Sequence, residues 1–212
     1  MTPKKTFSSP VHDRALVKAV EKSDIVGLKE ALDKGADPNV RDPATGRNLL
    51  FTILDKVSTE DGRKQEGSLW AQFFALQHAG ADAGLADNAG VTPLHYGFEK
   101  RDAMLVSVML LQEGLALNTP DPRTGETPLH LSLPLFLEGR EDIDKTPFEM
   151  LAAKGADPAV PDNAGLSALD IARASSAEKA SAAVEKMLNT PVMKQRRLHD
   201  RAKGQSLKLK HP

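Results

Sequence analysis

The amino-acid sequence predicts an all-α protein built from a repeated pair of helices. Aromatic residues make up only 4% of the chain, whereas β-sandwiches and barrels favour aromatic and β-branched residues. A short glycine-containing motif returns along the chain, and a segment with apolar residues at helical spacing precedes each copy. These observations favour stacked helices joined by short turns over a sheet-based fold.

Each predicted helix pair ends at a Gly-Ala-Asp motif or a degenerate form of it. Glycine directly after a helix takes the left-handed conformation that ends the helix without a steric penalty. The amphipathic segments before the motifs span residues 25–32, 69–76, 104–111 and 148–152. The four copies are Gly35-Ala36-Asp37-Pro38, Gly80-Ala81-Asp82-Ala83, Gly114-Leu115-Ala116-Leu117 and Gly155-Ala156-Asp157-Pro158.

A second glycine follows each motif inside a polar turn. The turns cover residues 42–46, 87–90, 121–125 and 162–165. Glycine supplies a positive φ at no steric cost, so the four segments are expected to form tight hairpin turns.

The start of a new helix after a hairpin is indicated twice by the same tetrapeptide. Threonine as N-cap accepts a hydrogen bond from an unpaired amide, and proline in the next position loses no helical hydrogen bond. The two copies are Thr92-Pro93-Leu94-His95 and Thr127-Pro128-Leu129-His130.

This order of hairpin, Thr-Pro-Leu-His helix, second helix and Gly-Ala-Asp turn resembles the ankyrin repeat. The copies span residues 11–41, 42–86, 87–120, 121–161 and 162–188. The resemblance implies an ankyrin-repeat solenoid of about five helix-turn-helix repeats with short connecting β-hairpins. It also implies that the first helices line a concave face and that His95 and His130 are structural, each bonding its threonine and the neighbouring hairpin backbone.

The chain divides by composition into three parts. We expect a flexible N-terminal segment at residues 1–10, the repeat domain at 11–188 and a basic tail at 189–212. The tail carries seven basic residues against one acidic residue, although the whole chain has a net charge of −1. The tail is interpreted either as a solvated extension or as a helix over 191–203 that contacts an anionic surface.

Three features depart from the repeat pattern. Charged insertions at residues 57–68 and 137–145 are expected to be solvated loops, either tolerated length variation or part of a binding face. The second repeat has Asn48-Leu49-Leu50-Phe51 in place of the tetrapeptide, so its hairpin should be less firmly tethered. Pro134 should kink its helix or end it early, either as an accommodated bend or as a special site.

Catalytic or metal-binding chemistry is not indicated by the sequence. Cysteine is absent, and the remaining histidines (His12, His78, His199 and His211) are isolated. No phosphate-binding glycine loop or catalytic triad order is present. We therefore expect no enzyme activity, no cofactor and no metal site.

Trp70, Phe73 and Phe74 form the main aromatic cluster, at the i, i+3 and i+4 positions of a predicted second helix. This spacing is typical of a stripe that packs against neighbouring helices. An exposed anchor for a partner is the alternative.

The resemblance implies that a partner protein binds at hairpin tips and at exposed positions of the first helices. Tyr96 and the arginines are favoured because Tyr and Arg are enriched among interface hot spots. The positions are Arg47, Asp55 and Lys56 in the second repeat, Asn88, Val91, Tyr96, Glu99 and Lys100 in the third, and Arg123, Glu126 and Leu131 in the fourth.

The expected function is that of a protein-protein interaction module or scaffold that acts as a monomer on an unidentified protein. Two alternatives stay open: a tether to nucleic acid or an anionic surface through residues 194–210, and a secreted microbial effector that binds a host protein. No membrane-spanning segment is expected, and the expected location is the cytoplasm, or a host cytosol for an effector.

Overall fold

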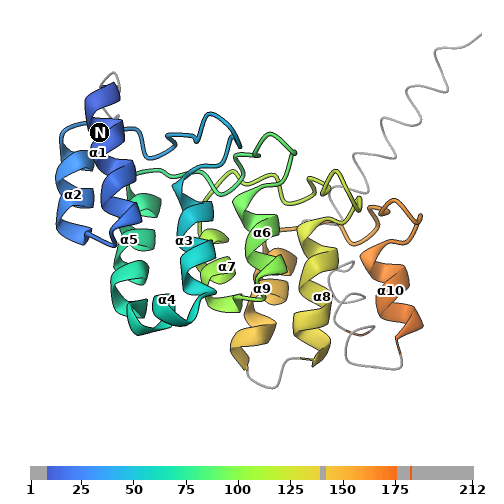
Figure 1. The fold of residues 1–212 in the computed structure, drawn as a ribbon. Helices are drawn as coiled ribbons and strands as arrows, with labels where there is room; N and C mark the ends of the chain where they lie inside the picture. The colour runs from blue at the N-terminus through green and yellow to red at the C-terminus, as the bar shows by residue number, and fades with distance from the viewer. Residues whose placement is uncertain (1–8, 139–141, 176–181, 183–212) are drawn as a thin grey trace, which may run out of the picture. The chain divides into compact units, whose positions relative to one another are not determined.

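The computed structural model describes residues 9–138, 142–175 and 182, and it confirms an all-α fold (Figure 1). No β-strand occurs in the described residues. Two isolated antiparallel bridges, Arg41 with Asn48 and Pro161 with Ser167, close two of the predicted hairpins. The chain forms two compact units, residues 1–115 and 116–212.

Unit 1 contains three helix pairs. In each pair the second helix packs against the first, and α3 also contacts α1 and α6. The pairs are α1 (Pro10–Glu21) with α2 (Ile25–Asp33), α3 (Leu49–Val57) with α5 (Glu66–His78), and α6 (Pro93–Glu99) with α7 (Ala103–Met109); α4 (Glu60–Lys64) lies between α3 and α5.

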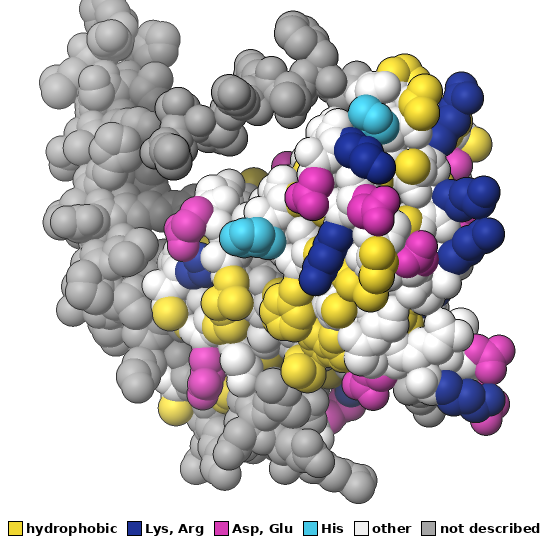
Figure 2. Space-filling view, turned by 90° about the vertical axis from the view of Figure 1, so that its left-hand side faces the viewer, with side chains coloured by type: hydrophobic (Ala, Val, Ile, Leu, Met, Phe, Trp, Pro, Cys, Tyr) yellow, Lys and Arg dark blue, Asp and Glu magenta, His cyan; other side chains and the backbone are white. Residues whose placement is uncertain are grey.

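The core of unit 1 consists largely of aliphatic side chains and three phenylalanines, Phe51, Phe73 and Phe98, of which Phe51 and Phe73 are fully buried. The side of this unit on which α1 and α2 lie retains hydrophobic surface. Figure 2 shows hydrophobic side chains gathered there beside charged ones, and Val11 and Val26 are 69% and 64% exposed.

Unit 2 contains the pair α8 (Pro128–Glu138) and α9 (Asp142–Ala153), followed by α10 (Ala168–Ala174), which packs against α8. Of the two outcomes expected for Pro134, a kink or an early end of its helix, the early end is wrong, because α8 continues to Glu138. Pro134 removes only one helical hydrogen bond. Its neighbours Leu133 and Leu135 are buried, and Phe136 stacks on Phe148 of α9 at 4.5 Å, so tertiary packing holds the turn beyond the proline.

The backbone confirms both sets of predicted glycine turns. All four closing glycines and all four hairpin glycines have positive φ: Gly35, Gly80, Gly114 and Gly155, and Gly46, Gly90, Gly125 and Gly165. At Gly46 and Gly125 close approach is a second reason for glycine. An added Cβ would lie 2.2 Å from Asn88 Oδ1 at Gly46 and 2.5 Å from Asn163 N at Gly125.

The charged insertion at 57–68 is not the solvated loop that we expected. Its centre forms α4, and its last residues begin α5. The Thr59 side chain accepts a hydrogen bond from Gly62 N at 3.0 Å, as an N-cap does. In the other insertion, α8 extends to Glu138 and α9 begins at Asp142. Both insertions therefore contain helical residues: the first forms α4 and the start of α5, and the second forms the end of α8 and the start of α9.

In three Gly-Ala-Asp turns a side chain accepts from the amide of the Asp: a residue of α1 in the first repeat, and a residue of the preceding repeat in the other two. Asp37 N donates to Asp13 at 2.8 Å, Asp82 N to Asn39 at 2.7 Å and Asp157 N to Asn118 at 2.7 Å. The carboxylates of these three aspartates accept from the amide two residues further on, which tightens each turn.

The turns inside the first and third helix pairs have the same geometry. Ser23 and Arg101 both have a φ of 56°, and each is followed by an aspartate that caps the second helix. Asp24 accepts from Gly27 N at 2.9 Å, and Asp102 accepts from Leu105 N at 2.9 Å.

Two glycines separate the effect of backbone conformation from that of contacts. An added Cβ meets nothing within 4 Å at either Gly80 (φ +94°) or Gly67, which lies in α5. We expect Gly80→Ala to lower the free energy of unfolding by about 1 to 2 kcal/mol. Gly67→Ala should raise it by about 0.5 to 1 kcal/mol. Urea unfolding of both variants checks the opposite signs, and two changes of the same sign would contradict this account.

The Asp102 cap should make stability depend on pH. Burial raises the pKa of the Asp102 carboxyl above its ordinary value of 3.8. Its contribution to stability is therefore fully present below that value and is lost as the pH rises through the folded pKa. Asp102→Asn keeps the accepting oxygen but cannot ionise, so the variant should gain stability relative to wild type as the pH rises from about 4 towards neutral.

Urea unfolding across this pH range measures the difference. Asp24→Asn is the matched control, because Asp24 caps α2 in the same way but is exposed. A difference between Asp102→Asn and wild type that stays constant with pH would contradict the prediction.

Candidate functional site

The first helices of the second and third pairs carry a cluster of charged and aromatic side chains, which we call the α3/α6 cluster: Arg47, Phe51, Asp55, Asp87, Tyr96 and Lys100. Asp55 on α3 is its centre. It forms an ion pair with Lys100 Nζ at 3.2 Å, lies 3.9 Å from Arg47 and accepts a hydrogen bond from the Tyr96 hydroxyl. Four of the predicted partner-binding residues thus meet at one place.

Both cations of the cluster lie over aromatic rings. The Arg47 guanidinium is 4.9 Å from the Phe51 ring centroid and 4.8 Å from that of Tyr96, and Lys100 Nζ is 4.9 Å from the Tyr96 centroid. The two rings are themselves 5.4 Å apart. Cation-π contacts at partly exposed sites each contribute about 0.5 to 1 kcal/mol, so they help to hold both side chains in one conformation.

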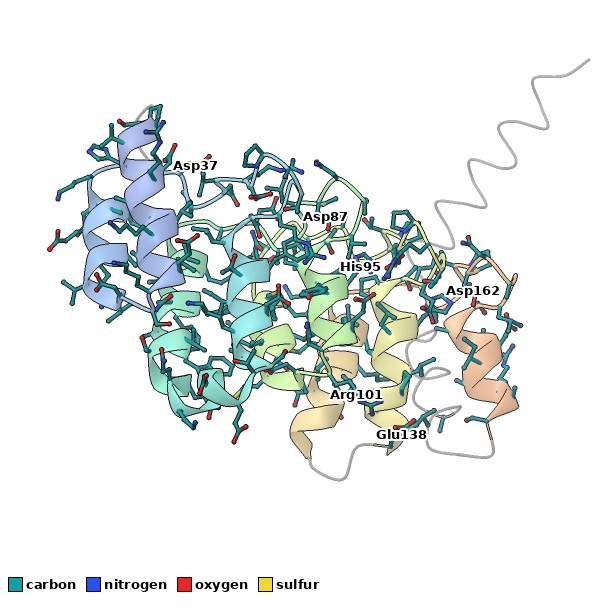
Figure 3. All side chains as sticks on the ribbon, viewed as in Figure 1. Asp37, Asp87, His95, Arg101, Glu138 and Asp162 are labelled. Carbon is teal, nitrogen blue, oxygen red and sulfur yellow. The ribbon has the colours of Figure 1, made fainter. Side chains whose placement is uncertain are left out.

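Asp87 lies in the hairpin before α6 (Figure 3), and it also anchors Arg47. Its carboxylate accepts from Arg47 Nε at 3.2 Å and from the amides of Ala89 and Val91. Burial opposes the charge on Arg47, but its interactions with Asp87 and Tyr96 outweigh burial and raise the pKa of Arg47. Tyr96 and then Asp55 raise the pKa of Lys100 against burial. Both residues therefore stay cationic near neutral pH.

The predicted residues at the hairpin tips are partly used to join hairpins. Asn88 is exposed, yet its amide and side chain donate to Thr45 O and Ala44 O at 2.9 and 3.0 Å. Glu99, at the end of α6, is exposed.

In unit 2, Arg123 forms an ion pair with Asp121 at 3.0 Å, and its side chain is 56% exposed. Glu126, in the same hairpin, and Leu131 of α8 are both half-buried. These three residues are not placed together with the α3/α6 cluster, because they belong to the other unit.

Val91 was expected to be exposed, and this is wrong. The residue is only 5% exposed because its side chain enters the core where the hairpin leads into α6. Its backbone closes the hairpin, since Val91 N donates to Asp87 and Val91 O accepts from the Asp87 amide.

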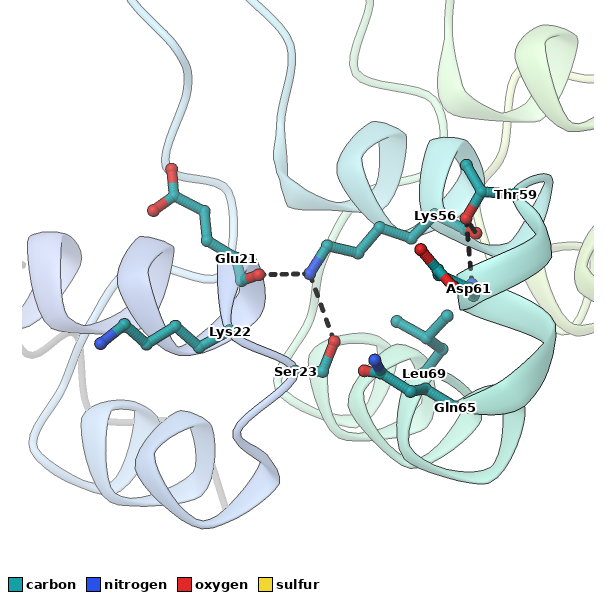
Figure 4. A pocket seen from close by; sticks show the side chains of 9 residues that line it. Glu21, Lys22, Ser23, Lys56, Thr59, Asp61, Gln65 and Leu69 are labelled. Carbon is teal, nitrogen blue, oxygen red and sulfur yellow. Dashed lines mark hydrogen bonds between the residues drawn. The ribbon is translucent and has the colours of Figure 1, made fainter.

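Lys56 is drawn into the protein and does not lie in the cluster. Its ammonium donates to Val20 O at 2.7 Å and Glu21 O at 2.6 Å, at the end of α1, and to Ser23 Oγ at 3.3 Å (Figure 4). The residue borders a cavity of about 190 Å³ between the end of α1 and α4. Burial lowers the pKa of Lys56. Its geometry is that of a cation at a helix C-terminus.

The two Thr-Pro-Leu-His motifs have the structural geometry that the resemblance implied. Thr92 Oγ1 and His95 Nδ1 are 2.7 Å apart, and Thr127 Oγ1 and His130 Nδ1 are 2.8 Å apart. The other ring nitrogen of His130 lies 3.1 Å from Leu166 O of the next hairpin. Both histidines are buried, so they fix helix starts and are not available to a ligand.

Sequence reasoning missed three residues. Phe51 and Asp87 complete the α3/α6 cluster. The sequence held a signal for Phe51: it lies four residues after Arg47, at the start of a predicted helix, a spacing that places two side chains on the same side of the helix. Arg41 corrects the expectation of a loosely tethered second hairpin, because it donates to Gly46 O at 2.7 Å and to Ala86 O at 2.8 Å. Asn48, which replaces the threonine, turns its side chain to Asp82 O.

The described residues contain no group of His, Asp and Glu side chains that could hold a metal ion. None of the described helices has the length and apolar character needed to cross a bilayer. The basic tail, including residues 194–210, lies outside the described residues, so both interpretations of it stay predictions. No protein-family model matches the chain, and no curated protein is significantly similar to it.

Two lysines on neighbouring first helices should have different effects on stability. Lys56→Met leaves the carbonyls at the end of α1 without their charged donor and should lower the free energy of unfolding by about 1 to 2 kcal/mol. Lys100→Met breaks only a partly exposed ion pair, so we expect a loss of less than about 1 kcal/mol. Thermal and urea unfolding measure both. A larger loss for Lys100→Met would show that the roles are assigned the wrong way round.

Proposed function

We propose that the chain is an ankyrin-type repeat protein that binds another protein, and that the α3/α6 cluster is the centre of its binding surface. The recurring helix pairs, the positive-φ glycines and the threonine-histidine pairs support the ankyrin arrangement. The cluster itself is the observation that carries the functional part of the proposal.

The cluster is suited to binding because it is ordered before a partner arrives. Arg47 and Lys100 have side chains 35% and 29% exposed, and each is held by an ion pair and an aromatic ring. Immobilising a long side chain on binding costs about 0.5 to 1.5 kcal/mol. Here much of that cost is met on folding. Arg and Tyr are also enriched among residues that dominate binding energy.

The charge of the cluster favours a protein over a nucleic acid as the partner. Two cations, Arg47 and Lys100, stand beside two carboxylates, Asp55 and Asp87. A surface that binds phosphate backbones needs a clear excess of positive charge. A balanced set of charges around aromatic rings fits the mixed polar and apolar surface of a protein.

The test is affinity capture from a cell lysate with the full-length chain, followed by identification of retained proteins. We expect one specific protein to be retained in high salt by wild type. The double variant Tyr96→Ala/Lys100→Ala should lose it, with an affinity at least about tenfold weaker, because hot-spot truncations cost more than about 1 kcal/mol each.

Lys29→Ala is the matched control, since it removes an exposed cation from α2, outside the cluster. It should retain the partner as wild type does, and circular dichroism should show that all three chains are equally helical. Undiminished capture by the double variant would contradict the assignment of the surface. Capture that collapses with salt and with deletion of residues 189–212 would favour the tail as the binding element.

A further inference from the structure

The second helices α5 and α7 of unit 1 are hydrophobic on their outward sides as well as on their buried sides. Phe73, Leu76, Leu105 and Met109 are buried, as the core requires. The outward residues Phe74 of α5 and Met104 of α7 are large and apolar too and are 48% and 49% exposed, and Leu111, just after the end of α7, is 65% exposed. A surface helix of a globular protein normally carries charged residues on that side.

Aromatic contacts order this surface. The Trp70 ring packs against Phe74 with centroids 5.7 Å apart and against the buried Phe73 at 6.4 Å. The indole N–H of Trp70 donates to Glu66 at 3.3 Å. The exposed Phe74 ring is thus supported from beneath, as anchor residues in binding surfaces are.

A hydrogen bond joins the segments that follow the two helices. Beyond the C-terminal ends of α5 and α7, Ala83 N donates to Gln112 Oε1 at 3.0 Å. We therefore treat the partly or fully exposed apolar residues of these two segments as one surface, which we call the α5/α7 face: Trp70, Phe74, Met104 and Leu111.

Within the two segments that form the α5/α7 face the carboxylates are not balanced by Lys or Arg. Residues 65–78 and 102–115 contain no Lys or Arg, and their carboxylates are Glu66, Asp102 and Glu113. Glu66 and Glu113 are exposed. An apolar centre with acidic residues at both ends is complementary to a helix with one apolar side and Lys or Arg beside it.

We propose that the α5/α7 face is a second docking surface, separate from the α3/α6 cluster, and that its partner is a basic amphipathic helix. The apolar side of this helix contacts Phe74 and Met104, and its cations reach Glu66 and Glu113. The inference does not rest on the proposed function, because it involves different helices of each pair.

The test uses two fluorescent synthetic peptides. One is made of leucine and lysine with leucines at i, i+3, i+4 and i+7, and the other has glutamate in place of lysine. We expect fluorescence anisotropy to show saturable binding of the lysine peptide to the full chain and none of the glutamate peptide. Binding should weaken about tenfold in Phe74→Ser/Met104→Ser and also in Glu66→Lys.

Two controls locate the effect. Val26→Ser changes an equally exposed apolar residue of α2 and should leave binding unchanged. Tyr96→Ala/Lys100→Ala should also leave it unchanged, so a failure of the α3/α6 proposal is distinguishable from a failure of this one. All variants alter exposed or half-exposed side chains, and circular dichroism checks that each is folded.

Three results would overturn the inference: no binding of the lysine peptide, equal binding of both peptides, or equal binding by Phe74→Ser/Met104→Ser and wild type. Sedimentation velocity tests the alternative that a second copy of the chain, and not a basic helix, covers the α5/α7 face. A dimer that is lost in Phe74→Ser would assign the α5/α7 face to self-association and would also overturn the proposed partner.

Discussion

The close approach of successive hairpins is the constraint on which the rest of the structure depends. In unit 1 the backbone and side chain of Asn88 bond the carbonyls of Thr45 and Ala44, and in unit 2 Asn163 does the same to Thr124 and Arg123. This contact is possible only where the facing residue has no Cβ, as at Gly46. Each hairpin thereby sets the position at which the next first helix begins.

The α3/α6 cluster is a direct consequence of that constraint. Arg47 follows the hairpin turn at residues 42–46, just before α3, and Asp87 begins the next hairpin turn, at residues 87–90. Once the two hairpins are joined, the guanidinium lies between the Asp87 carboxylate and the Tyr96 ring. A side chain that helps to join the two hairpins is therefore also a partly exposed cation with several ordered contacts. If the α3/α6 cluster binds a partner as proposed, a change to Arg47 alters stability and binding together.

Most of the fold could be predicted from the sequence, because its signals are local. Glycine turns and Thr-Pro helix starts depend on a few adjacent residues, and the structure confirms them. Pairwise contacts between repeats could not be predicted in the same way. Val91 and Lys56 hold positions that look exposed by alignment, yet one is buried and the other reaches the end of α1. The partners of a long side chain depend on geometry that spacing alone does not contain.

In unit 1 the outward side chains of the first helices α3 and α6 differ in polarity from those of the second helices α5 and α7. The two sets therefore differ in the free energy of exposure to water. On α3 and α6 the outward residues are ionic and mutually paired, so they remain solvated while ordered. On α5 and α7 the outward residues are apolar, and leaving them in water costs about 25 cal/mol for each Å² of apolar surface. Phe74 and Met104 are about half exposed, whereas the residues next to them in sequence, Phe73 and Leu105, are buried in the core. In the docking that we propose, the partner helix covers these exposed apolar side chains and removes that cost.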